Sequence, residues 1–319
     1  MSVCFGLVVS GQNPEGMPSY DFYRKTAIQA EKLGFDSIWS TDHISFVNPI
    51  LEGLIALAHL SGCTQRIKLG IGVLLLPLRH PTIVAKQFAS LDFLSGGRTI
   101  LGVGVGGEGK KDFEAVEIPL NQRGGRTNEA IKIVRELWKG APVTFSGSFY
   151  KLENISIDPP PIQTPGPPIW VGGRSPAALR RTYMLGDGWL AYPSSSKRVR
   201  KDWDVIRRGA ESAGRSAEEI TFGQTLTIAV TDSLKKGREQ VARHLSARYK
   251  RPYDAQKVSE FSIAGPPEAC VEQLNSYIKI GVRHFVFIPT APPSQMNDEI
   301  GRIHSEVLQP FLKINDRIE

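Results

Sequence analysis

Apolar residues along the chain fall into short runs that alternate with segments of helical spacing. Runs rich in Val, Ile and Leu with little polar alternation are typical of strands buried on both faces, as in parallel sheets. Segments whose apolar positions recur every three or four residues are typical of amphipathic helices. The pattern predicts strands at residues 3–10, 35–40, 66–75, 99–103, 169–172, 188–191, 220–230 and 282–288.

Helical spacing separates these predicted strands. Glycine ends several of the helices, as at Gly34 and Gly96, because it readily takes the left-handed conformation beyond a helix C-terminus. Residues 145–157 are predicted to form an inserted hairpin, and the proline-rich residues 159–168 a stiff extended connector. The predicted helices cover residues 20–33, 49–59, 80–95, 126–138, 176–185, 199–213, 234–249, 268–280 and 297–312.

Alternation of strands with helices predicts a parallel sheet joined by right-handed crossovers. Eight strands without an internal boundary favour an α/β fold with a single (β/α)8 TIM barrel, here a single domain over residues 1–319. Insertions are expected after strands 4 and 7, where the alternation loosens. A doubly wound open sheet is the competing architecture.

Composition indicates a globular protein. Hydrophobic residues make up 41% of the 319 residues, and the 31 Gly and 22 Pro are scattered, which excludes collagen-like, disordered and coiled-coil classes. The net charge of +7 is spread along the chain, so it favours an anionic small molecule over nucleic acid; a basic surface without a ligand is the alternative.

The number and spacing of cysteines, and the length of the apolar runs, indicate the cellular compartment. Cys4, Cys63 and Cys270 show no C-x-x-C spacing, so neither a disulfide framework nor a cysteine metal site is expected. The apolar run at residues 69–78 is too short to cross a bilayer. We therefore expect a cytoplasmic protein that does not associate with membranes.

Polar residues directly after a barrel strand are the first candidates for chemistry, because the strand C-terminal ends form the active face of this fold. Asp42 and His43 follow the second strand. A neutral imidazole can accept or return a proton near neutral pH, and a carboxylate can hold its tautomer. Neighbouring strand residues point to opposite sides, so an Asp42–His43 hydrogen bond requires the chain to have left the strand. His43 is either catalytic or stabilises its loop.

Glycines after later strands are candidates for ligand binding. Gly104 and Gly106 follow the fourth strand, where they let the backbone approach a flat or anionic ligand; a tight packed loop is the alternative. Anion sites are predicted after the fifth and sixth strands, where free amides and a helix N-terminus come together. Their residues are Gly172, Gly173, Arg174, Tyr192 and Ser194, with helix capping as the alternative for residues 194–196. No H-E-x-x-H or G-x-S-x-G motif is present, so no metal site is predicted.

Taken together, these segments resemble the bacterial luciferase-like oxidoreductase superfamily. The resemblance extends in order over nearly the whole chain. It is carried by GFDSIWSTDH at residues 34–43, LRHPTIVAKQFASLDFLSGGR at 78–98, LGVGVG at 101–106, PIWVGG at 168–173, GDGW at 186–189 and SIAGPPEA at 262–269.

The resemblance implies a TIM barrel, usually a homodimer, that binds FMN or the deazaflavin coenzyme F420 and acts on a small-molecule substrate. The pair Asp42-His43 is similar to that of the F420-dependent branch, which implies that both residues face the reactive part of the ring. The resemblance also implies a non-proline cis peptide at Gly72-Val73, against which the ring packs. The segment Gly104-Val105-Gly106 is implied as a further cofactor contact.

These observations predict reversible hydride transfer between a small organic substrate and coenzyme F420, with His43 handling the proton. An FMN-dependent monooxygenase and a non-catalytic flavin-binding barrel are the alternatives. Gly107 separates Gly106 from Glu108, which departs from the pattern of the branch, so Glu108 is not assigned a role. Residues 234–260 carry no recognisable motif, and the substrate is not predicted.

Overall fold

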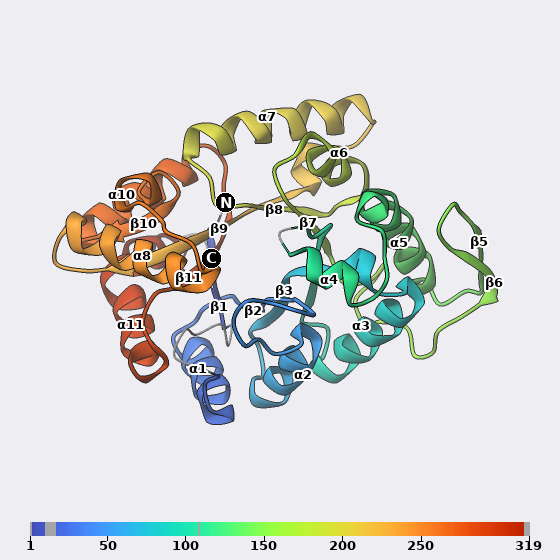
Figure 1. The fold of residues 1–319 in the computed structure, drawn as a ribbon, viewed down its shortest axis with the longest axis horizontal. Coiled ribbons are helices and arrows are strands. Elements are labelled where there is room, and N and C mark those ends of the chain that lie inside the picture. Colours follow the sequence, from blue (N-terminus) through green and yellow to red (C-terminus); the bar gives the residue numbers. More distant parts are fainter. Residues whose placement is uncertain (1, 10–16, 108, 316–319) are drawn as a thin grey trace.

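A closed parallel barrel forms the centre of the molecule (Figure 1), as seen in a computed structural model that describes residues 2–9, 17–107 and 109–315. The strands lie in the order β11-β1-β2-β3-β4-β7-β8-β9, and β9 pairs with both β8 and β11, which closes the ring. The barrel strands are β1 (Cys4–Val8), β2 (Ser37–Ser40), β3 (Lys68–Leu75), β4 (Thr99–Gly104), β7 (Ile169–Gly172), β8 (Gly188–Ala191), β9 (Thr221–Val230) and β11 (His284–Pro289).

Helices surround the strands and bury their apolar faces against the outside of the barrel (Figure 1). They are α1 (Tyr20–Lys32), α2 (Gly53–Cys63), α3 (Pro81–Ser95), α5 (Arg123–Trp138), α6 (Pro176–Leu185), α7 (Ser196–Ser212), α8 (Leu234–Tyr249), α10 (Pro267–Ile278), α11 (Met296–Arg302) and α12 (Gln309–Asn315). The large residues Trp39 and Trp170 belong to a second apolar cluster with their rings 5.4 Å apart, and both contact the ring of His284.

Insertions follow the fourth and seventh barrel strands, as predicted. After β4 come α4 (Lys110–Glu114), α5 and an antiparallel hairpin of β5 (Val143–Ser146) and β6 (Lys151–Ile155), which projects beside α5 in Figure 1. After β9 come α8, α9 (Ala255–Val258) and β10 (Ser262–Gly265), which pairs in parallel with the end of β9. These two insertions bring α4 and α8 to the mouth of the barrel.

The structure confirms the eight predicted strands and the barrel, and the open sheet is excluded because β9 closes the ring. The second predicted helix begins at Gly53 and not at residue 49, since Glu52 is extended and its side chain caps Ile55. The predicted last helix is interrupted by a π-helical segment (Ile303–Leu308). The strand β10 was not predicted, because four residues carry too little periodicity.

Within the described ranges, no helix is both long and apolar enough to span a membrane.

Candidate functional site

A cavity of about 260 Å³ opens at the C-terminal ends of the barrel strands. The loops that follow β2, β4, β7 and β8 contribute its walls, together with the last residues of β3 and the end of α8. Ten of the predicted site residues line it: Asp42, His43, Gly72, Val73, Gly104, Val105, Gly106, Gly172, Gly173 and Tyr192. Residues predicted from separate motifs therefore lie around one cavity.

The other two predicted residues lie next to this cavity. The Arg174 guanidinium stacks over the Tyr192 ring at 4.9 Å and its Nη1 donates to Ser194 Oγ at 3.3 Å. Neighbouring Ser195, not Ser194, caps α7 with its side chain. Arg174, Tyr192 and Ser194 thus form one polar cluster between the ends of β7 and β8.

His43 is held by a carboxylate that the sequence did not single out. Its Nδ1 lies 2.9 Å from Oδ2 of Asp112 on α4, and Asp112 Oδ1 accepts from the backbone amides of Ile44 and Ser45, both at 2.8 Å. A carboxylate can only accept, so Nδ1 carries the hydrogen and Nε2 is the basic nitrogen of the neutral ring. The ring also stacks on Phe46 with centroids 4.3 Å apart. Asp112 therefore fixes both the tautomer and the orientation of His43.

Asp42 has a different partner from its neighbour in sequence. Its two carboxylate oxygens accept from the guanidinium of Arg79, both at 2.8 Å, and Oδ2 also accepts from the Leu75 amide at 2.9 Å. Arg79 in turn donates to Glu52 at 2.9 Å. The Asp42 side chain is fully buried, and it ties the loop after β2 to the end of β3. No hydrogen bond joins Asp42 to His43 among the contacts of the described residues.

The peptide between Gly72 and Val73 is cis, as the resemblance implied. The register between β3 and β4 shifts between Ile71 and Leu74, so the backbone bulges at this point. Val73 is half-buried on this bulge and lines the cavity.

Glycine is required at two positions around this bulge. A Cβ on Gly104 would lie 2.4 Å from Val73 Cγ2, so the wall can pack this closely only without a side chain there. Gly173 has a φ of +116°, and a Cβ at that position would lie 3.1 Å from the Cβ of Ala178. The result is a cavity with bare backbone on part of its wall, which suits a flat ring.

Two residues of α8, Arg248 and Tyr249, close the cavity, and no motif in the sequence marked them. Arg248 is buried and lies 5.6 Å from the centre of the Tyr249 ring. Only the basic helical character of this segment was visible in the sequence. The sequence contains even less indication that Asp112 belongs to the site, because Asp112 lies in a polar stretch where no pattern predicts burial.

Two further polar residues, His80 and Arg126, have local structural roles. The His80 ring accepts from the Thr82 amide at 3.3 Å and so caps α3. Arg126 donates to Gln122 at 2.9 Å and stacks near the ring of Phe149. Glu108 lies outside the described residues.

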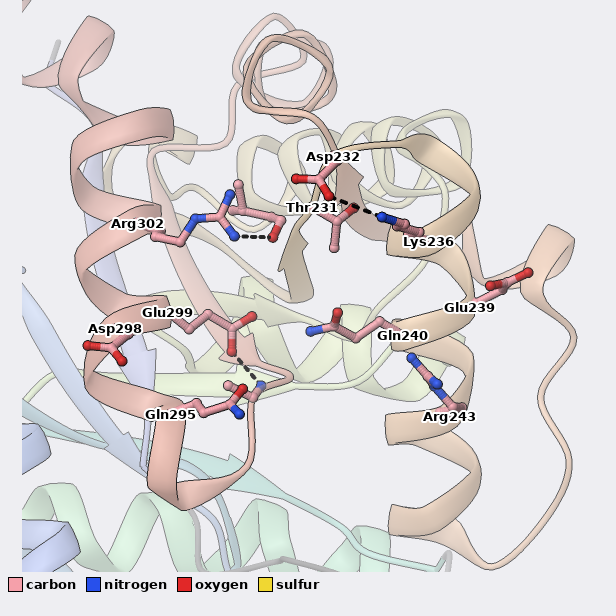
Figure 2. Close-up of a pocket in the computed structure, with 12 residues that line it drawn as sticks. Thr231, Asp232, Lys236, Glu239, Gln240, Arg243, Gln295, Asp298, Glu299 and Arg302 are labelled. Carbon is pink, nitrogen blue, oxygen red and sulfur yellow. Dashed lines mark hydrogen bonds and ion pairs between the residues drawn. The ribbon is translucent and has the colours of Figure 1, made fainter.

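A larger groove of about 540 Å³ lies between α8 and α11 (Figure 2). Several of its polar groups bind each other: Gln240 Nε2 donates to Thr290 Oγ1 at 2.9 Å, and the Glu299 carboxylate accepts from the Ala291 amide and from the Thr290 hydroxyl, the latter at 3.1 Å. Lys236 pairs with Asp232. No predicted site residue lines this groove, so it is not part of the candidate site.

No group of three or more metal-ligating side chains occurs in the part of the chain that the structure describes.

Fold and site together define a class of protein. It is a TIM barrel whose mouth holds a cavity partly lined by glycine backbone and a histidine bound to a carboxylate. The family model for luciferase-like monooxygenases matches residues 2–284, and the chain belongs to this family.

Curated relatives and solved structures agree with this assignment. The chain is 28% identical over 317 residues to an F420-dependent glucose-6-phosphate dehydrogenase of Microbacterium testaceum, covering 90% of this chain and 91% of the relative. The coenzyme F420 dependent tetrahydromethanopterin reductase of Methanopyrus kandleri has the same fold, with 22% identity, a TM-score of 0.80 and coverage of 98% and 100% of the two chains. A type II Baeyer-Villiger monooxygenase of Pseudomonas putida, solved with FMN, shares the fold with 20% identity, a TM-score of 0.75 and coverage of 96% and 98%.

Proposed function

We propose that this protein is an oxidoreductase that transfers a hydride between a small organic substrate and coenzyme F420. The observation that carries the proposal is the His43–Asp112 pair at a cavity walled by the backbone of Gly72, Gly104 and Gly173. F420-dependent relatives of similar length support the choice of cofactor.

The cavity suits a flat, tricyclic ring because glycines of β3, β4 and β7 leave part of its wall without side chains. We assign Gly72, Val73 and the segment Gly104-Val105-Gly106 to packing against the ring. Amides of Gly172 and Gly173 would hold the cofactor phosphate, beside the polar cluster of Arg174, Tyr192 and Ser194. When bound, the deazaflavin supplies a ring carbon that accepts or donates a hydride in a two-electron step.

Proton transfer falls to His43 in this proposal. In the oxidative direction the substrate carbon loses a hydride to the cofactor, and its hydroxyl loses a proton as the carbonyl forms. His43 Nε2 accepts that proton while Nδ1–H remains bound to Asp112, which stabilises the charged imidazolium. Asp42 is assigned to positioning, since Arg79 already engages both of its oxygens. Reversal of the same proton transfer serves the reductive direction.

Titration of purified protein with F420 and with FMN at equal salt, followed by intrinsic Trp fluorescence, tests the cofactor. We expect saturable F420 binding that weakens as salt rises, because the +7 chain attracts the phosphate and acidic tail of this cofactor. Tight FMN binding with reductase-dependent oxygen consumption, and no measurable F420 binding, would replace the proposal with the monooxygenase. Binding of either cofactor without turnover on any donor would favour a non-catalytic flavin-binding barrel.

The resemblance supports three further proposals. We propose that the chain acts as a single domain, as a homodimer and in the cytoplasm. Light scattering on the purified protein measures the oligomeric state, and cell fractionation measures the compartment.

A further inference from the structure

The loop that carries His43 is fastened to the C-terminal end of α8 by one buried side chain. Asn48 lies five positions after His43, and its side-chain amide donates to the backbone carbonyls of Ala247 at 3.1 Å and of Arg248 at 2.7 Å. Carbonyls only accept, so the NH₂ end of the Asn48 amide faces the helix. Asn48 is buried, and it lies 200 positions from Arg248 in the chain.

These two carbonyls belong to the last turn of α8, where backbone acceptors have no partner within the helix. The helix ends at Tyr249, and Lys250 takes the left-handed conformation with a φ of +51°. Asn48 therefore supplies, from a distant part of the chain, donors that the helix itself cannot supply. In return, the helix end gives the loop after β2 a rigid support.

Aromatic rings connect the same loop to the same helix end. Phe46 stacks on the His43 ring with centroids 4.3 Å apart, and its ring meets the edge of the Tyr249 ring at 6.3 Å. Phe46 lies between two fixed points of the loop, because Asp112 accepts from the two backbone amides before it and Asn48 is bound to α8. The place of Phe46 against His43 is therefore set by Asn48 as well as by Asp112.

Other parts of the fold hold the rest of α8. Its apolar side packs with α9, β10 and the end of β9 in a cluster separate from the main core. Gln240 Nε2 donates to the hydroxyl of Thr290, which follows β11, at 2.9 Å. Asn48 and Phe46 join this helix to the β2 side of the barrel mouth, where His43 lies.

We propose that Asn48 is a positioning residue for His43, on which it acts through the loop after β2 and not through contact with substrate or cofactor. This inference rests on the proposed function, because the position of His43 matters for turnover only if its Nε2 handles the substrate proton. A misplacement of about 1 Å in an active site can cost about 100-fold in rate. Without Asn48, Asp112 still faces His43, but the loop beyond is no longer held against α8. Turnover should therefore fall while cofactor binding is retained.

Removing a cap from each end of α8 separates positioning from helix stability. Asn48→Ala removes the donors to the C-terminal carbonyls, and the matched control, Ser233→Ala, removes the side chain that caps the N-terminus of the same helix. We expect Asn48→Ala to lower kcat by about tenfold or more, while F420 affinity changes less than about threefold. Ser233→Ala should keep the wild-type values of both. Turnover is followed as F420 reduction with 2-propanol, glucose and glucose 6-phosphate, and the fastest donor is used for all variants.

Nitrogen-15 NMR of the histidine rings gives a readout that needs no substrate, and it decides the test if none of the three donors is turned over. The chain has six histidines, so His43→Ala assigns the His43 signals. Wild type and Ser233→Ala should show His43 in one tautomer, with the hydrogen on Nδ1. In Asn48→Ala the His43 signals should move toward the average of both tautomers, because the ring is no longer kept on Asp112.

A second variant serves if Asn48→Ala does not fold. Phe46 is only half-buried, and Phe46→Leu removes the ring through which the loop contacts both His43 and Tyr249. We expect the same direction of change in kcat and in the His43 signals, again with F420 affinity retained.

Three outcomes would overturn the proposal. A wild-type kcat and wild-type His43 signals in Asn48→Ala would show that Asn48 only caps the helix. Equal losses of kcat in Asn48→Ala and Ser233→Ala would assign the effect to the stability of α8. A loss of about tenfold in the F420 affinity of Asn48→Ala would assign Asn48 to cofactor binding. Failure of the proposed function is distinguishable, because it removes F420 binding from wild type itself.

Discussion

Two hollows on this molecule differ in volume and in the groups that line them, and the larger one is not the candidate functional site. The groove between α8 and α11 is the larger, at about 540 Å³ against about 260 Å³, yet several of its polar side chains bind each other. The mouth cavity is walled in part by glycine backbone, and its proposed reactive group, His43, is held by Asp112 with Nε2 as the basic nitrogen. Volume alone therefore does not select the candidate site, and we base that choice on the orientation of the hydrogen-bonding groups.

Helix α8 contributes residues to both hollows, so the two hollows can be compared by substitutions on one helix. Gln240 faces the groove and donates to Thr290, whereas Arg248, two turns further along, lines the mouth cavity. The same helix thus contributes a hydrogen-bonded glutamine to the groove and a buried arginine to the wall of the mouth cavity. Substitutions on its two ends should separate structural from functional effects.

The largest effect is expected from His43→Ala. Loss of a general acid–base group lowers turnover by a factor on the order of 100 to 10,000. F420 affinity should change little, because we propose that backbone groups provide most of the cofactor contacts. Gln240→Ala, in the groove, is the control and should keep the wild-type kcat. Equal kcat values for His43→Ala and wild type, under conditions where chemistry limits the rate, would remove His43 from the mechanism.

Asp112→Asn should have the next largest effect. Asp112 Oδ1 accepts two backbone amides, so an asparagine would keep its oxygen there and present its NH₂ group to His43 Nδ1. His43 would then carry its hydrogen on Nε2, which is the wrong tautomer for a base. We expect kcat to fall at least about tenfold.

A control on the same short helix distinguishes this positioning role from a merely structural one. Glu114→Gln, on the exposed side of that helix, should leave kcat unchanged. An Asp112→Asn enzyme with the wild-type kcat would contradict the tautomer argument.

Gly173→Val tests whether the backbone wall is functional. Valine at a φ of +116° is strained, and its Cβ would press on Ala178 at the start of α6. We expect F420 affinity to fall by at least about tenfold. Gly301→Ala, on α11 beside the groove where a Cβ has open space, should not change it. A folded Gly173→Val protein with unaltered F420 affinity would make Gly173 a packing residue only.

The smallest effect concerns the stability of the groove. Burial raises the pKa of the Glu299 carboxyl, although its hydrogen bonds to Ala291 and Thr290 oppose this. The raised folded-state pKa means that the contribution of Glu299 to stability is full below the unfolded value of about 4.3 and is lost as the pH rises through the folded value. Glu299→Gln removes the charge and keeps an acceptor for the Ala291 amide.

Urea denaturation at pH 4 and pH 7 measures this difference. Relative to wild type, Glu299→Gln should gain stability as the pH rises from 4 to 7, with F420 affinity unchanged. A stability difference that does not depend on pH would show that Glu299 is well solvated or well paired. A change in F420 affinity would instead connect the groove to the mouth cavity and weaken the contrast between them.

Local patterning determined most of the architecture. The near-continuous apolar runs specify strands buried on both faces, and the three-and-four spacing between them specifies the covering helices. Together these periodicities predicted all eight barrel strands and both insertions. The glycines at 104, 106, 172 and 173 and the pair Asp42-His43 were equally visible, because each is a short motif directly after a strand. Helix boundaries such as Gly53 depended on a cap that periodicity does not show.

Only the tertiary structure decided which of these groups act together. His43 and Asp112 are 69 positions apart, and Asn48 and Arg248 are 200 apart, so no local pattern relates them. Closure of the barrel brings the loops after β2 and β4 and the end of α8 to one mouth, and burial there pairs each polar group with the nearest complementary one. For that reason Asp42, adjacent to His43 in sequence, binds Arg79, while a carboxylate from a distant polar stretch orients the histidine.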